Sequence, residues 1–242
     1  MKTRSAVAAL GSLLFCAVAH ASVVYDNLAT PLGNYLGGFA YEEVADDVTL
    51  GPGPRIFRSA EIAYAGFNFD GDETLTLSLY EMDGAPTPGS FGFNTPGTVL
   101  FSQTLPILAT NGTTIVFADP TPSIVLPNVV AIGLAFAGVD FDPTGAGSDA
   151  GPLLFHPPVV GSSLDDFWLR GFPNPGDPWG LYTFGGNPPI NLGARINAVP
   201  EPASIALILI GLCAAVVAFG RARKPPKVAR VRAGRRHPVP RR

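Results

Sequence analysis

Two short segments of the chain combine carboxylate, amide and hydroxyl oxygens in a spacing that could bind a divalent cation. In residues 68–73 the oxygen-bearing side chains come at alternate positions, and residues 140–145 follow the first half of a calcium-binding loop. Gly151 stands where that type of loop places its bidentate glutamate. Because Asp, Asn and Gly also form turns without any ion, a plain turn is the alternative in both segments. The candidate calcium ligands are Asn68, Asp70 and Asp72 in the first segment and Asp140, Asp142 and Thr144 in the second.

Aromatic side chains gather between residues 167 and 184, and both tryptophans of the chain are among them. An exposed aromatic ring offers a flat apolar face on which a sugar ring can lie. The alternative is that these rings pack against one another inside a loop-rich β domain. The candidate glycan platform consists of Trp168, Trp179 and Tyr182.

Catalytic residues are harder to find. His156 is the only histidine between residues 22 and 198, and no G-x-S-x-G nucleophile elbow is present. Two carboxyl groups could act as the acid and base of a glycoside hydrolase, but the sequence selects no pair. We therefore expect no enzyme, no catalytic residue and mostly solvated acidic side chains. The adjacent acids that could supply such a pair are Glu42, Glu43, Asp46, Asp47, Asp165 and Asp166.

The charges fall into blocks of opposite sign. Residues 22–198 contain 18 acids against four arginines, a net charge of −14, whereas residues 221–242 contain ten Lys or Arg and no acid. A strongly negative domain repels nucleic-acid phosphates, so we expect no nucleic-acid partner. Residues 22–198 contain no cysteine, which excludes a disulfide, a zinc–thiolate site and a cysteine nucleophile from this domain.

Residues 22–198 show short period-2 patterns of apolar residues separated by turn formers. The chain contains 28 Gly and 25 Pro, which favours many turns over long helices. The clearest strand is 73–82, where Leu75, Leu77 and Leu79 alternate with polar residues. Asn111-Gly112 predicts a hairpin turn. We expect an all-β domain of the β-sandwich or jelly-roll type. Its other predicted strands are 23–28, 45–50, 60–67, 98–105, 113–118, 123–126, 129–137, 179–184 and 193–197.

Two apolar segments flank this domain. Residues 1–21 have the pattern of a signal peptide: basic residues, an apolar run too short to span a bilayer, and Ala19-His20-Ala21 before Ser22 as the cleavage site. Residues 203–219 contain no charge and reach the lower length limit of a membrane span. The basic cluster Arg221, Arg223 and Lys224 follows as a stop-transfer and positive-inside signal. We expect a single transmembrane helix at 203–220 and a basic, disordered cytoplasmic tail at 225–242.

The tetrapeptide Val199-Pro200-Glu201-Pro202 stands directly before the apolar segment. Its two prolines disfavour a helix and withdraw two backbone donors, so Glu201 should be displayed on an extended, accessible stretch. This order of motif, apolar span and basic cluster resembles the PEP-CTERM sorting signal, and the resemblance covers residues 199–224. It implies recognition of Val199, Pro200, Glu201 and Pro202 by an exosortase, a membrane-embedded cysteine protease of Gram-negative bacteria. It also implies delivery to the cell surface or the extracellular matrix.

The sequence thus predicts a signal peptide at 1–21, a secreted all-β domain at 22–198, a sorting signal at 199–224 and a tail. We expect a non-enzymatic surface or matrix protein that needs no cofactor, with calcium as the open question. Its expected partners are the Sec translocon, signal peptidase, an exosortase, the inner membrane during passage, and exopolysaccharide. The alternatives are a carbohydrate- or calcium-binding surface module and a secreted carboxylate-dependent glycoside hydrolase.

Overall fold

The computed structural model describes residues 20–38, 40–86, 94–118, 123–140, 147–187, 189–201 and 210–211. The chain divides into two compact units, Met1–Glu201 and Pro202–Arg242. The strands of the first unit are β1 (Ser22–Asp26), β2 (Pro31–Tyr35), β3 (Glu43–Thr49), β4 (Ile56–Phe67), β5 (Thr74–Glu81), β6 (Val99–Pro106), β7 (Thr110–Ala118), β8 (Val129–Ala137), β9 (Asp149–Phe155), β10 (Ser162–Ser163), β11 (Asp166–Arg170), β12 (Gly180–Thr183), β13 (Asn191–Leu192) and β14 (Ala194–Val199).

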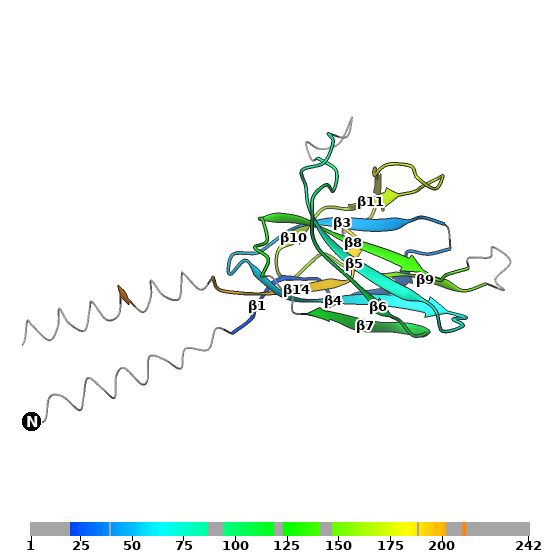
Figure 1. The fold of residues 1–242 in the computed structure, drawn as a ribbon, viewed down its shortest axis with the longest axis horizontal. Helices are drawn as coiled ribbons and strands as arrows, with labels where there is room; N and C mark the ends of the chain where they lie inside the picture. The colour runs from blue at the N-terminus through cyan, green and yellow to red at the C-terminus, as the bar shows by residue number, and fades with distance from the viewer. Residues whose placement is uncertain are drawn as a thin grey trace, which may run out of the picture. The chain divides into compact units, whose positions relative to one another are not determined.

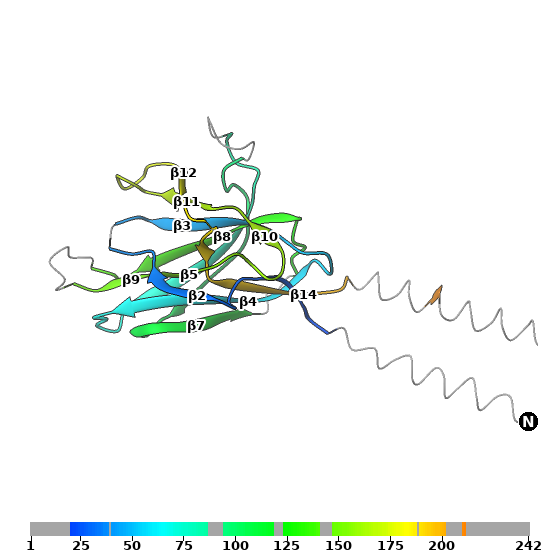
Figure 2. The same ribbon diagram turned by 180° about the vertical axis from the view of Figure 1, so that it is seen from behind.

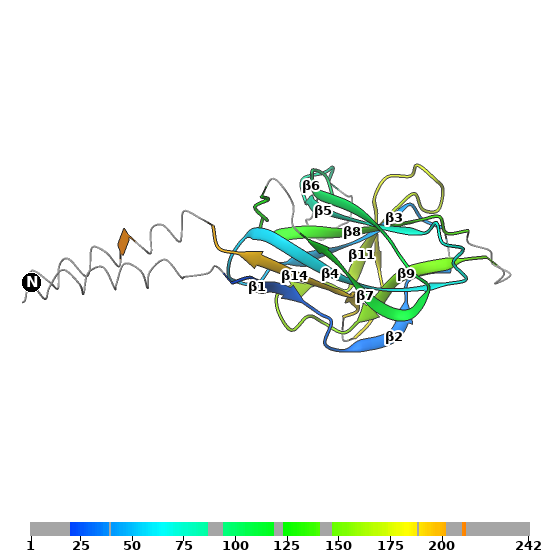
Figure 3. The ribbon, with the colours of Figure 1, turned by 60° about the horizontal axis from the view of Figure 1, so that its bottom comes forward.

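These strands form two antiparallel sheets that face each other (Figure 1). The first sheet has the order β1-β14-β4-β9-β13, with β2 against β9 and β7 against β4. The second has the order β12-β11-β3-β8-β5-β6, with β10 against β3. Figure 2 shows the same layers from behind, and Figure 3 shows β1, β14, β4 and β7 side by side in the first sheet. The predicted all-β architecture is confirmed.

Strand β5 illustrates how the sequence specifies the layers. Leu75, Leu77 and Leu79 are fully buried, since alternate side chains of a strand point to opposite faces and these three face the other sheet. On the opposite face, the hydroxyl of Thr76 lies 2.8 Å from that of Thr104 on β6. The period-2 pattern therefore fixes both the existence of β5 and the face that it buries.

Two local expectations are wrong. Asn111-Gly112 is not a hairpin turn but lies inside β7, where Gly112 has φ +145° and the pairing with β4 shifts register. The glycine therefore accommodates an irregularity of the strand, not a reversal of the chain. β6 and β7 also belong to different sheets. The predicted strand 123–126 contributes only an isolated bridge between Val125 and Ile56.

Apolar side chains form two clusters on opposite faces of the second sheet. The main cluster fills the space between the sheets and includes Phe167 and Leu169 of β11. The smaller one, called the outer cluster here, lies on the other face, because its members alternate in sequence with main-core residues. It consists of Ala45, Tyr80, Ala131 and Trp168, with Met82, Trp179 and Leu181 packed against them.

The first and last strands of the β-sandwich lie next to each other. β1 pairs antiparallel with β14, and Ser22 faces Ala198 in this register. Asn27, which is 1% exposed, reinforces the connection. Its side-chain nitrogen donates to the carbonyl of Leu192 at 2.7 Å, and its side-chain oxygen accepts from the N–H of Ala194 at 2.7 Å. The first and last strands of the domain are thereby held together.

Candidate functional site

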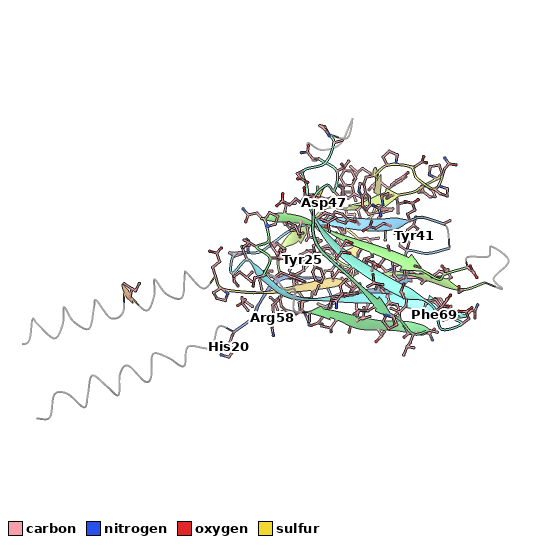
Figure 4. The ribbon with its side chains drawn as sticks, in the orientation of Figure 1. His20, Tyr25, Tyr41, Asp47, Arg58 and Phe69 are labelled. Atoms are coloured by element: carbon pink, nitrogen blue, oxygen red, sulfur yellow. The ribbon has the colours of Figure 1, made fainter. Side chains whose placement is uncertain are left out.

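The acidic loop between β4 and β5 brings three carboxyl groups together. Oxygen atoms of Asp70, Asp72 and Glu73 lie within 4.8 Å of one another. Glu73 is not among the predicted ligands and joins two of them, Asp70 and Asp72. The side-chain nitrogen of Asn68, the third predicted ligand, donates to the carbonyl of Gly147 at 3.1 Å. Phe69, labelled in Figure 4, marks the position of this loop. Asp140, the first residue of the second predicted segment, lies close enough for its charge to act on Asp72.

The electrostatics of this loop reflect crowding of negative charge. A hydrogen bond with Asp70 and the charge of Asp70 raise the pKa of Asp72, and Glu73 and Asp140 add to this effect. Glu73 is held in place because its two oxygens accept from the N–H groups of Asp70 at 2.8 Å and Gly71 at 2.9 Å. An all-oxygen set of this kind suits Ca²⁺. Asp142 and Thr144 lie outside the described residues.

The predicted glycan platform does not exist as a single surface. Trp168 is 0% exposed, and its indole N–H donates to an Asp47 oxygen at 2.9 Å on the neighbouring strand. A ring with no exposed face cannot carry a sugar, so this part of the prediction is wrong. Figure 4 labels Asp47 on β3, beneath the loops that follow β11 and β5.

The other two aromatic residues of the prediction are separated by the sheet. Trp179 packs in the outer cluster, with its ring edge toward Tyr80 and the Arg170 guanidinium 5.3 Å from its centroid. Tyr182 packs instead against the main core and stacks on Phe167. Both are half-buried. Trp179 and Tyr182 therefore pack against different clusters and form no common surface.

Four of the acids expected at the solvated surface are buried. They lie on β3 and β11, and each is exposed by less than 5%: Glu43, Asp46, Asp47 and Asp166. Burying a carboxylate costs free energy unless it is hydrogen-bonded or ion-paired. Glu43 accepts from the Tyr80 hydroxyl at 2.8 Å and pairs with Arg170 at 2.7 Å. Asp46 accepts from the Ser163 hydroxyl at 2.7 Å and from the N–H of Leu192 at 2.9 Å. These contacts join β3 to its neighbours.

Burial governs the ionisation of these acids. It raises the pKa of Glu43, Asp46 and Asp47 above their ordinary values, and the hydrogen bonds partly offset the rise. Asp166 has no such offset from a side-chain partner, since neither of its carboxyl oxygens makes a hydrogen bond. Burial, followed by the charges of Asp47 and Asp165, raises the pKa of Asp166 to about 6.

Asp165 and Glu42, the other two acids considered as a catalytic pair, accept hydrogen bonds from loop backbones. Asp165 accepts from the N–H groups of Gly186 at 2.6 Å and Ile190 at 2.8 Å. Glu42 accepts from the N–H of Gly176 at 2.7 Å.

A hollow of about 420 Å³ beside β7 is lined by Tyr64 and by residues 106–110 and 113–115, none of which is an acid or a histidine.

The sandwich ends at the sorting tetrapeptide. β14 runs to Val199, which faces Ile56 of β4, and Pro200 follows without a backbone donor to continue the ladder. Glu201 is exposed. Ala21 and Ser22 are exposed as well, so cleavage after Ala21 would leave β1 intact from its first residue. Ala19 and Pro202 lie outside the described residues.

Comparison with known families decides the nature of this end of the chain. A family model described as the PEP-CTERM protein-sorting motif matches residues 198–224. The chain carries a PEP-CTERM sorting signal. No curated protein and no solved structure matches the chain. The PEP-CTERM signal identifies an exported protein that is sorted by an exosortase, with transient membrane association before display at the cell surface.

The PEP-CTERM signal extends beyond the part of the chain that the structure describes. The basic cluster Arg221, Arg223 and Lys224 and the tail 225–242 lie outside it, as does the predicted span 203–220 apart from Ile210 and Gly211. Among the described residues, no helix has the length and apolar character needed to cross a membrane.

Proposed function

We propose that this chain is a non-enzymatic surface protein whose β-sandwich is exported and then retained in an extracellular exopolysaccharide matrix. The observation that carries the export part of the proposal is the pairing of β1 with β14, next to the PEP-CTERM signal. Signal peptidase and exosortase would act at the same end of the domain, beyond Ser22 and beyond Val199. The sandwich would pass through both steps without losing a strand.

The use of the acidic residues supports a non-enzymatic role. A glycoside hydrolase needs two carboxyl groups that line a cleft with room for a sugar between them. In this domain the candidate acids Glu43, Asp46 and Asp47 are buried and bonded to residues of β5, β13 and β11 respectively. Asp165 and Glu42 hold loop backbones. We therefore favour a binding or structural role over hydrolysis.

The sorting part of the proposal is tested by replacing Pro200, Glu201 and Pro202 with alanines. We expect a chain that begins at Ser22, keeps its basic tail and stays at the inner membrane. Cell fractionation and mass spectrometry of both termini measure this. The wild-type protein should begin at Ser22 and lack the basic tail. A matched control replaces Pro157 and Pro158, a proline pair in a loop far from the motif in sequence. Unaltered surface delivery of the triple-alanine variant would contradict the proposal.

The matrix part is tested separately in cells that make no exopolysaccharide. The correctly sorted protein should then appear in the medium, because its retention depends on the polysaccharide. Equal retention with and without the polysaccharide would exclude the matrix role while leaving the sorting step intact.

A calcium-binding role stays a prediction, and the cluster of Asp70, Asp72 and Glu73 makes it testable. Because the carboxyl groups repel one another, a bound cation would relieve their repulsion and join the two acidic segments. Isothermal titration of the sorted protein with calcium, with Asp72→Asn as the variant, measures this directly. The absence of heat at millimolar calcium would exclude the site.

A further inference from the structure

Strand β7 borders the first sheet. It pairs with β4 from Ala118 to Thr110, and no strand of the described residues lies against its other side. In both Figure 1 and Figure 2, β7 forms the lower border of the sandwich. A border strand presents a row of backbone donors and acceptors that can pair with another chain.

The register shows which backbone groups face outward. The N–H of Ala63 on β4 donates to the carbonyl of Gly193, on the side away from β7. Successive residues of an antiparallel strand direct their backbone groups to opposite sides, so Ile62 directs its groups toward β7. Ile62 faces Ile115, and the neighbouring positions Thr114 and Val116 therefore direct their N–H and C=O groups away from the sheet.

From Thr113 to Ala118 this border lacks the protection that sheet edges usually have, because its one irregularity, the register shift at Gly112, comes before this stretch. Natural edges often carry a charged residue or a proline, whereas no charged residue occurs between positions 84 and 118. Val116 is 54% exposed and Leu108 is 79% exposed. By contrast, β6, the border of the second sheet, ends in Pro106. Since the N–H of Ile107 donates inward to Glu73, Pro106 occupies an outward-facing position and removes a donor there.

Charge restricts where a second copy of this domain can approach the first. Two domains that each carry a net charge of −14 repel each other over most of their surface. The β7 border is uncharged, and Glu61, which faces Val116 on β4, is ion-paired at 3.2 Å with Arg195, which also pairs with Asp26 at 3.0 Å. Two copies can therefore approach through β7 without bringing unpaired acids together.

We propose that β7 pairs antiparallel with β7 of a second copy of this chain, so that the two first sheets join edge to edge. A two-fold axis at Ile115 places Thr114 of one copy opposite Val116 of the other. In this register the outward N–H and C=O groups of both residues exchange hydrogen bonds across the axis. The interface is isologous and closes at a dimer. It lies on the sandwich itself, so it does not depend on retention in a matrix.

Cross-linking of the surface-sorted protein tests this pairing. Cys16 and Cys213, the only cysteines, are first changed to serine, and Val116→Cys is then treated with a short bismaleimide. We expect a covalent dimer from Val116→Cys and none from the control Val159→Cys, whose site is 65% exposed elsewhere on the domain. Equal yields from the two positions would overturn the proposal.

Two further variants separate pairing from simple proximity. Adding Thr114→Pro to Val116→Cys removes an outward N–H that makes no bond to β4, and we expect loss of the cross-linked dimer. An unchanged yield would refute the pairing. If this proline unfolds the domain, Val116→Lys decides, because two like charges across the axis should raise the dimer Kd roughly tenfold in sedimentation equilibrium at low salt. An unchanged Kd, or a dimer that forms only with exopolysaccharide present, would equally overturn self-pairing.

Discussion

Asp166 offers a quantitative test of the buried acids on the second sheet. Its carboxyl group is 3% exposed and makes no hydrogen bond through either oxygen. Asp47 and Asp165 add negative charge nearby, after burial itself, and the pKa of Asp166 rises from its ordinary 3.8 to about 6. Asp166→Asn keeps the shape of the side chain and removes its charge.

The sign of the effect follows from proton linkage. Between pH 4 and pH 6 the unfolded chain releases the Asp166 proton while the folded chain keeps it, so the free energy of unfolding falls as the pH rises. Above pH 6 the folded state carries the full penalty. At about 1.36 kcal/mol per pKa unit, Asp166 costs the folded state about 3 kcal/mol at pH 7 and little below pH 4.

Urea unfolding of the mature surface protein, followed by tryptophan fluorescence at pH 4 and pH 7, measures this penalty. The difference in free energy of unfolding between Asp166→Asn and wild type should shift in favour of the variant by about 2 to 3 kcal/mol from pH 4 to pH 7. The cost of burying the amide is the same at both pH values and cancels in this comparison. Glu81→Gln, which removes one charge from a half-buried position on β5, controls for net charge. A pH profile of Asp166→Asn parallel to that of wild type would refute this account of the buried acid.

Three further outcomes follow from the contacts described above. Trp168→Ala should lower the free energy of unfolding by about 3–5 kcal/mol in urea titrations, since it empties a buried site; a stable variant that merely loses polysaccharide would restore the platform hypothesis. Calcium at about ten times its Kd should raise the Tm of the wild-type domain by about 3–5 °C, and Asp72→Asn should abolish this shift. A wild-type Tm that calcium does not change would show that the loop binds no ion. Gly133→Ala should cost about 1–3 kcal/mol, because its Cβ would meet the Glu43 carboxylate and the Tyr80 ring; unchanged thermal unfolding would contradict this packing.

The fold class was predictable because the strands with one buried face have regular alternation. The alternation of Leu75, Leu77 and Leu79 with polar residues predicts β5, and the apolar run at 129–137 predicts β8. β9 escaped prediction because Gly151 and Pro152, usually loop residues, stand inside it. The neighbouring chain requires a glycine at position 151, since a Cβ there would meet the carbonyl of Leu36. Such exceptions depend on neighbours that are distant in sequence.

The candidate sites were predictable in part. The PEP-CTERM signal is contiguous, so its residues are visible in sequence order. The outer cluster is not, because β3, β5, β8 and β11 meet there from separate parts of the chain. The sequence identifies Trp168 as an aromatic residue but not as one buried beside Asp47. Similarly, it proposes Asn68 as a calcium ligand, while the turn brings Glu73 to the other two acids.

The pairing of the first strand with the last has a consequence for export. β1 leaves the membrane first, yet its only strand partner among the described residues, β14, emerges after all the others. Contacts between such distant segments form late in folding, since the intervening chain must be available first. The first sheet can therefore gain β1 and β14 as a pair only when Val199, the first residue of the sorting tetrapeptide, is itself reaching the outer side. We therefore expect the domain to be completed at about the time at which the sorting tetrapeptide becomes accessible to an exosortase.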